Sequence, residues 1–200
     1  LINARRLEDY RLDGEYLIAV DGTEQHRFKD RDRPHCPQCL KQTHSNGTTD
    51  YFHSVLEAKL VTREGLALSM ASEFIENGGR EYDKQDCELK AFYRLAPELK
   101  RQFPRLAICL LLDSLYANET LLDICLENSW SFYVGFKEGS IPNLYKQMLE
   151  TMAKHPAQVV RGEDDTEQYT CRWACNLTHK GHRLHAVMCE VKAKKDGKET

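Results

Sequence analysis

The 200-residue sequence lacks a long apolar run, a strong net charge of either sign and any internal repeat. No apolar segment reaches the ~18 residues of a membrane-spanning helix, and the amino terminus LINARRLEDY has no signal-peptide pattern, which favours a cytoplasmic protein without a membrane partner. The formal net charge of −3 excludes a uniformly basic nucleic-acid-binding protein but permits local basic patches. The chain does not begin with Met and ends in a hydrophilic run, which favours a fragment of a longer protein.

The eight cysteines do not indicate a disulfide framework, because that use of cysteine is typical of much smaller secreted chains. Cys87, Cys109 and Cys125 fall on the apolar faces of expected helices and strands. We therefore expect reduced thiols packed in a core at these positions.

Two apolar segments each end on an aspartate. Residues 106–112 form a continuous apolar run of the length of a strand buried on both faces, and Asp113 follows it directly. Tyr16-Leu-Ile-Ala-Val20 repeats the design and is followed by Asp21-Gly22. Open α/β sheets bind ligands at the carboxyl ends of their strands, so we expect Asp21 and Asp113 at one end of neighbouring strands.

The remaining pattern predicts a mixed α/β chain. Alternating apolar residues predict strands, and apolar spacing of three and four residues predicts helices: strands at 51–61, 66–75, 131–137, 169–177 and 183–192, and helices at 83–103, 118–128 and 141–154. The strand–helix–strand order from residue 106 onward implies parallel pairing with crossover helices. The predicted organisation is a lead-in over 1–15, a core over 16–155 with a Cys/His loop at 24–50, and an incomplete β-hairpin insertion over 156–200.

Paired carboxylates at adjacent strand ends favour a divalent cation. Two such groups repel each other unless a cation lies between them, and Mg²⁺ or Mn²⁺ combines few carboxylates with water and phosphate oxygens. Asp21 and Asp113 are therefore candidate ligands for phosphoryl transfer. The alternative is structural, with Asp21-Gly22 as a turn and Asp113 as the cap of a bend.

Four stretches of the sequence resemble the catalytic domain of bacterial insertion-sequence DDE transposases. These stretches are YLIAVDGTE (16–24), CPQCL…YFHSVLEAKLV (36–61), KQDCELKAF (84–92), and LLDSLYANE (111–119) followed by FYVGFK (132–137). They occur in the family's order and cover nearly the whole chain from Tyr16 onward. The resemblance implies a ribonuclease-H-like α/β fold with a mixed sheet, crossover helices and part of an inserted β-subdomain.

The same resemblance implies metal-dependent cleavage and strand transfer of DNA, by a transposase that self-associates on DNA. Asp21 and Asp113 would be its first two catalytic acids and would hold Mg²⁺ or Mn²⁺. The family's third acid is a glutamate that follows the β-subdomain, and we expect it beyond Thr200, so residues 1–200 should be inactive alone. The alternatives are a catalytically inactive, zinc-stabilised DNA-binding module, and a different metal-dependent nuclease or phosphoesterase.

A cluster of cysteines and histidines lies in the expected 24–50 loop and at the start of the strand that follows it. Cys36 and Cys39 have the C-x₂-C spacing of half a zinc site, and His44 and His53 could complete a tetrahedron. Because the sequence has no second C-x₂-C, ordinary reduced thiols remain the alternative. A second set contains Cys171, Cys175, His179, His182 and His185. Four residues of strand separate its two cysteines by ~13 Å, which opposes a shared metal.

Several charged residues have both a functional and a structural interpretation. Lys137, at the end of the 131–137 strand, and the loop cations Lys29, Arg31 and Arg33 are candidate contacts for DNA phosphates, or else solvated surface residues. The same choice applies to five cations around the first long helix: Lys90, Arg94, Lys100, Arg101 and Arg105. Asp86 and Glu88 are expected in the first turn of that helix, where acids interact favourably with the positive helix end, and a metal role is the alternative.

Overall fold

The structure is a computed structural model that describes residues 7–30, 32–79 and 81–194. The chain divides into two compact units between Phe136 and Lys137. This division lies earlier in the chain than the boundary at residue 155 that the sequence suggested. Helix α3 (Pro142–Lys154) belongs to the second unit, where the backbone N–H of Thr178 in strand β8 (Glu167–His179) donates to Gln147 Oε1 at 2.8 Å.

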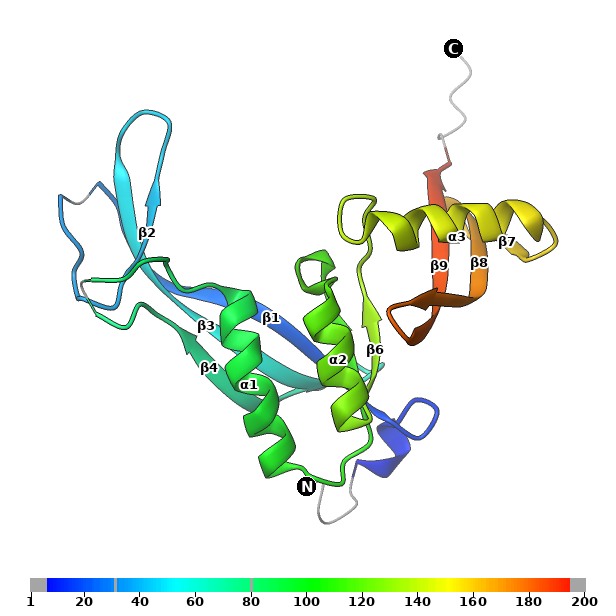
Figure 1. The fold of residues 1–200 in the computed structure, drawn as a ribbon, viewed down its shortest axis with the longest axis horizontal. Coiled ribbons are helices and arrows are strands. Elements are labelled where there is room, and N and C mark those ends of the chain that lie inside the picture. Colours follow the sequence, from blue (N-terminus) through cyan, green and yellow to red (C-terminus); the bar gives the residue numbers. More distant parts are fainter. Residues whose placement is uncertain (1–6, 31, 80, 195–200) are drawn as a thin grey trace. The chain divides into compact units, whose positions relative to one another are not determined.

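The first unit contains one six-stranded sheet (Figure 1). Its strands are β1 (Tyr16–Phe28), β2 (Leu40–Thr43), β3 (Thr49–Val61), β4 (Ala67–Ile75), β5 (Ile108–Leu112) and β6 (Ser131–Val134). The order is β2-β3-β1-β5-β6, and β4 also pairs with β3. Strand β3 is antiparallel to β1, β2 and β4, whereas β5 is parallel to both β1 and β6. The predicted mixed α/β sheet is confirmed.

Two α-helices complete this unit, α1 (Glu88–Gln102) and α2 (Glu119–Asn128), with short 3₁₀ turns η1 (Glu8–Tyr10) and η2 (Ser114–Tyr116). Helix α2 begins where the sequence predicted, because the Asn118 side chain accepts a hydrogen bond from the Leu121 backbone N–H at 3.0 Å. Helix α1 begins at Glu88, later than the predicted start at residue 83, and continues through Pro97.

The core of the first unit lies between the sheet and these helices. Alternate residues of β1 and β5, including Ile18, Ile108 and Leu110, are completely buried. They are covered by an apolar stripe on α1 made of Ala91, Phe92, Leu95, Ala96 and Leu99. Because a fully buried leucine or isoleucine contributes ~1.5–3 kcal/mol, this packing fixes the strands that carry Asp21 and Asp113.

Strand β1 is longer than the sequence predicted. Asp21-Gly22 does not turn the chain, because β1 continues to Phe28 and pairs with β3 down to the Phe28–Tyr51 pair. The polar composition of residues 21–28 hid this extension, most of which is exposed on the surface. The predicted 24–50 loop is correspondingly shorter, since β2 and the start of β3 also lie within it.

The second unit pairs α3 with a separate antiparallel sheet in the order β7-β8-β9. Strands β8 and β9 (His182–Ala193) form the hairpin that the sequence predicted outside the main sheet, whereas β7 (Val159–Glu163) was not predicted. Ala174 and Leu177 of β8 are buried, as are Leu144 and Met148 of α3. Among the described residues of both units, no helix has the length and apolar character needed to cross a membrane.

Candidate functional site

The structure brings Asp21 and Asp113 to the same end of two adjacent strands. Strands β1 and β5 are parallel, and Ala19 lies opposite Leu111 in their register. Each aspartate follows two residues later along its strand direction, at the carboxyl end of the paired segment. Both side chains are exposed to solvent. The predicted strand neighbourhood is therefore present, and with it the edge at which α/β sheets place their ligands.

Local hydrogen bonds hold one oxygen of each aspartate. Asp113 Oδ1 accepts from the Leu115 backbone N–H at 2.8 Å and caps η2, which is the structural role considered from the sequence. Asp21 Oδ1 accepts from the Gly22 backbone N–H at 3.0 Å. In both residues the bonded oxygen is Oδ1.

Glu88, the first residue of α1, lies beside this pair. A Cβ built on Gly22 would lie only 2.5 Å from Cδ and Oε1 of Glu88, so the glutamate side chain packs directly on the β1 backbone next to Asp21. The buried Tyr116 hydroxyl donates to Glu88 Oε2 at 3.5 Å. The sequence predicted that Glu88 interacts with the positive end of its own helix. Its proximity to Asp21 could not be predicted from the sequence, because it depends on how α1 packs on the sheet.

The three carboxylates share one electrostatic environment. Burial raises the pKa of Glu88, and the negative charges of Asp21 and Asp113 raise it further, while the hydrogen bond from Tyr116 lowers it. Burial also raises the pKa of the Tyr116 hydroxyl, with added contributions from Glu88, Asp113 and Asp21. Carboxylates that repel one another in this way are stabilised by a divalent cation.

A fourth acid lies on the neighbouring strand β3, next to Asp21, but has its own cation. Glu57 of β3 is the register partner of Asp21. The Lys59 Nζ lies 2.6 Å from Glu57 Oε2, and its hydrogen bond lowers the pKa of Glu57. Glu57 is therefore compensated locally, which distinguishes it from Glu88.

Cys36, Cys39 and His53 form a second group that could hold a metal ion. Their ligand atoms all lie within 4.8 Å of one another. The two Sγ atoms are 3.2 Å apart, and His53 Nε2 lies 3.3 Å from Cys36 Sγ and 3.5 Å from Cys39 Sγ. Burial raises the pKa of the Cys39 thiol, and its hydrogen bond with Cys36 adds to this effect.

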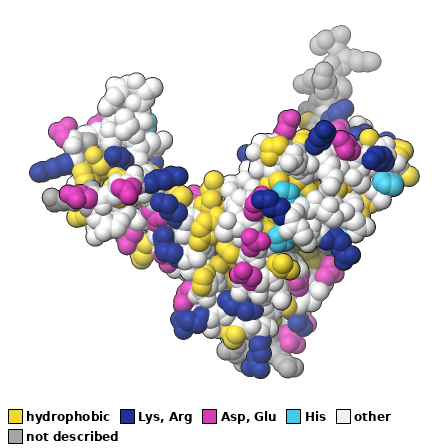
Figure 2. All heavy atoms as spheres, in the orientation of Figure 1, with side chains coloured by type: hydrophobic (Ala, Val, Ile, Leu, Met, Phe, Trp, Pro, Cys, Tyr) yellow, Lys and Arg dark blue, Asp and Glu magenta, His cyan; other side chains and the backbone are white. Residues whose placement is uncertain are grey.

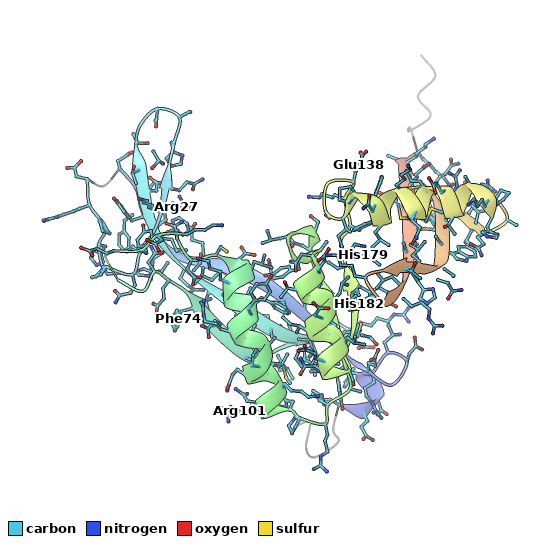
Figure 3. All side chains as sticks on the ribbon, in the orientation of Figure 1. Arg27, Phe74, Arg101, Glu138, His179 and His182 are labelled. Atoms are coloured by element: carbon cyan, nitrogen blue, oxygen red, sulfur yellow. A yellow bond between two sulfur atoms is a disulfide. The ribbon has the colours of Figure 1, made fainter. Side chains whose placement is uncertain are left out.

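The fourth residue of the predicted zinc set, His44, lies in a different interaction. Its Nε2 is 3.1 Å from Asp50 Oδ2, and the same oxygen lies 3.0 Å from Arg27 Nη1. Arg27, labelled in Figure 3, also donates to Gln42 Oε1 at 2.9 Å. The hydrogen bonds from His44 and then Arg27 lower the pKa of Asp50. His44, which directly follows β2, thus contacts Asp50 of β3 and stabilises the pairing of these two strands. It is not part of the cysteine group.

The predicted phosphate contacts differ in their surroundings. Lys29 and Arg33 are exposed, Arg31 lies outside the residues that the structure describes, and Lys137 is the first residue of the second unit. The cations on α1 have internal partners. Arg94 bridges Glu73 and Asp86, Lys100 Nζ donates to Asn128 O at 3.0 Å, and Arg101 pairs with Glu98.

The charge on the visible surface is mixed. In Figure 2, Lys and Arg side chains alternate with Asp and Glu side chains on the face shown. This agrees with the formal net charge of −3.

The cysteines of the second unit were only partly anticipated. Cys171 and Cys189 lie opposite each other in the β8–β9 register and form a disulfide, although the eight cysteines of the sequence did not indicate a disulfide framework. Cys175 is free and exposed. His179 and His182 lie opposite each other at the β8–β9 turn (Figure 3). Cys109 and Cys125 are buried free thiols as expected, whereas Cys87 is exposed at the start of α1.

Comparison with known proteins does not assign this chain to a family. No family model matches this chain, and no curated protein matches it.

Proposed function

We propose that this protein catalyses metal-dependent phosphoryl transfer on DNA, as a DDE-type transposase catalytic domain with a ribonuclease-H-like fold. One observation carries the proposal: Asp21 and Asp113 lie at the same end of adjacent parallel strands, with the Glu88 carboxylate beside them. The antiparallel β4-β3-β1 set followed by parallel β5 and β6 supports the fold assignment. The resemblance of the four sequence stretches supports the choice of DNA as substrate.

Each acid has a distinct part in the proposed site. Asp21 and Asp113 offer Oδ2 to Mg²⁺ or Mn²⁺, while their Oδ1 atoms remain in the backbone hydrogen bonds that orient them. Glu88 contributes a third carboxylate, positioned by Tyr116. Bound divalent ions would activate the attacking hydroxyl and stabilise the leaving oxygen of the DNA phosphodiester.

The position of Glu88 changes one expectation. The resemblance implied that the third acid follows the β-subdomain and that residues 1–200 are inactive alone. With Glu88 in contact with the β1 backbone beside Asp21, three carboxylates are present within the first unit. We therefore propose that this chain binds divalent cations and nicks DNA.

The DNA contacts are proposed on the exposed cations Lys29 and Arg33, which follow β1. Such contacts weaken steeply as salt rises, because each neutralised phosphate releases counterions. Self-association on DNA is proposed from the resemblance alone, since strand transfer joins two DNA segments.

The test is nicking of supercoiled DNA by the full chain in Mg²⁺ or Mn²⁺. We expect Asp21→Asn and Asp113→Asn to abolish nicking, and Glu88→Gln to reduce it ~10²–10³-fold, as loss of one transition-state electrostatic contribution commonly does. Asp123→Asn, which changes an exposed acid on α2, is the matched control and should leave the rate unchanged. Nicking that persists in Asp113→Asn would contradict the proposal.

Two other functions differ from this one in what they predict. A general metal-dependent nuclease or phosphoesterase would use the same acids but would not join a DNA 3′-hydroxyl to a second DNA. A DNA-binding module without catalysis, stabilised by zinc, is favoured by the Cys36, Cys39 and His53 group. It would retain DNA binding in Asp21→Asn and show no divalent-dependent nicking.

A further inference from the structure

Cys36, Cys39 and His53 already have nearly the spacing of zinc ligands. A tetrahedral ion with Zn–S distances of 2.3 Å and Zn–N distances of ~2.05 Å places its sulfurs ~3.8 Å apart and each sulfur ~3.6 Å from the nitrogen. The observed sulfur–nitrogen distances are 3.3 and 3.5 Å, and the sulfur–sulfur distance is 3.2 Å. A small opening of the two thiols would admit the ion.

We propose that this group binds one zinc ion, with His26 as the fourth ligand. The site goes beyond the proposed phosphoryl transfer, because no step of that reaction uses it. Its function is structural, and its tests are therefore independent of whether the protein acts on DNA.

The chemistry of the donors selects zinc over the cations proposed for the acidic cluster. Two thiolates and imidazole are soft or borderline ligands that suit Zn²⁺, whereas Mg²⁺ and Mn²⁺ favour carboxylates and water. The two cysteines are not joined to each other, since both are free thiols. Their separation of 3.2 Å is also well above the ~2.05 Å of a disulfide bond.

The backbone holds the cysteine turn in place without the metal. The Cys39 N–H donates to Cys36 O at 3.3 Å, and the Cys36 N–H donates to Cys39 Sγ at 3.4 Å. Asn77, which is 2% exposed, donates from Nδ2 to Cys39 O at 2.7 Å and from its backbone N–H to Gln38 O at 3.1 Å. A turn anchored from a neighbouring strand end is preorganised for a metal.

His26 is the histidine best placed to complete the tetrahedron. It is the direct register partner of His53 across the β1–β3 pair, so the two Cβ atoms lie on one face at a spacing of ~4.5–5.5 Å. His35 stacks on Phe28 at a ring-centroid distance of 4.5 Å, and His44 is bound to Asp50. His26 is exposed, so its side chain is free of core packing and can rotate toward His53.

The location of the ion explains what it would stabilise. His53 lies between the part of β3 that pairs with β2, which ends at Phe52, and the part that pairs with β4, which begins at Ser54. Zinc would therefore link the turn that carries Cys36 and Cys39 and the end of β1 to β3 at His53, the position between its pairings with β2 and β4.

The experiment measures zinc in the full chain purified without chelators and with reductant. We expect close to one zinc per chain in the wild type, in His44→Ala and in Cys175→Ser, the last being the matched control for an exposed free cysteine. Cys36→Ser and His53→Ala should lose the zinc. His26→Ala should weaken zinc affinity by more than the ~10–100-fold cost of removing a residue that only hydrogen-bonds a ligand.

Co²⁺ substitution keeps the test independent of whether a variant folds poorly. Wild-type protein stripped of metal and titrated with Co²⁺ should show intense tetrahedral d–d bands and a thiolate charge-transfer band, and Zn²⁺ should displace both. Wild-type protein that takes up neither ion would overturn the site. Loss of zinc in His44→Ala would overturn the ligand set, and an unchanged Co²⁺ spectrum in His26→Ala would overturn the fourth ligand.

Discussion

Gly22 lies so close to Glu88 that any side chain at position 22 would occupy the space of the glutamate carboxylate. A Cβ there would stand 2.5 Å from Cδ and Oε1 and 2.8 Å from Cγ of Glu88. The groups it would meet are the far end of a flexible side chain, not backbone. The glycine is therefore required for the position of Glu88 more than for the path of β1.

The first prediction is that Gly22→Ala separates stability from metal binding. The free energy of unfolding should change by less than ~1 kcal/mol, because Glu88 can rotate away and a compatible Gly→Ala change also restricts the unfolded chain. Divalent binding, followed by isothermal titration, should weaken strongly. Gly78→Ala, where an added Cβ meets nothing within 4 Å, is the control and should bind normally.

The second prediction concerns pH and Glu88. Its pKa in the folded protein is raised above the ordinary 4.5 by burial and by the charges of Asp21 and Asp113, so folding favours its protonated form. The stability that this provides is fully present below pH 4.5 and is lost as pH rises through the folded-state pKa.

Glu88→Gln removes this titration. Without divalent ions, its free energy of unfolding relative to wild type should increase between pH 4 and neutral pH, by ~1.4 kcal/mol for each unit by which the Glu88 pKa is raised. Urea titrations over this pH range would measure the difference. A difference that stays constant with pH would show that Glu88 is not destabilised by its neighbours.

The third prediction is that divalent cations stabilise the protein through the acidic cluster. Mg²⁺ or Mn²⁺ at ten times its dissociation constant should add ~1.4 kcal/mol to the free energy of unfolding. The increase in Tm should disappear in Asp21→Asn and Asp113→Asn. It should persist in Glu163→Gln, which alters an exposed acid of the second unit. Equal stabilisation of all four proteins would place the cation elsewhere.

The sequence predicted those parts of the fold that local patterns determine. The apolar run of β5, the Asn118 cap of α2 and the alternation of β8 and β9 each indicated the right element. The extension of β1 to Phe28 could not be predicted in this way. It depends on pairing with β3, while its own residues are polar and largely exposed.

The candidate sites show the same division between local and long-range information. Asp21 and Asp113 could be placed together because the ends of parallel strands share an edge. Glu88 could not, since its approach to Gly22 depends on how α1 packs against the sheet. Spacing alone also could not choose between His44 and His53 as partners of Cys36. That choice follows from the β3 register and from Asp50, which engages His44.

The fourth prediction is that the disulfide stabilises the second unit alone. The Cys171–Cys189 bond joins positions 18 residues apart, and closing a loop of about this length is worth ~3 kcal/mol in the chain-entropy model. Dithiothreitol, or a Cys171→Ser and Cys189→Ser double variant, should therefore speed amide hydrogen exchange in β8 and β9. Exchange in β5 should be unaffected, and Cys175→Ser should behave as wild type. Unchanged protection of β8 in the reduced protein would contradict this assignment.

The outer edge of β3 is covered by two separate strands, β2 along Thr49–Phe52 and β4 from Ser54 to Val61. Strand β2 has only four residues and directly follows the cysteine turn at Cys36–Cys39, and beyond its backbone pairing it is joined to β3 by the His44–Asp50 contact. Release of that turn would expose unpaired backbone N–H and C=O groups on β3, which are a template for strand addition by another chain. Aggregation, rather than simple unfolding, is therefore the expected fate of protein whose cysteine turn is oxidised or truncated.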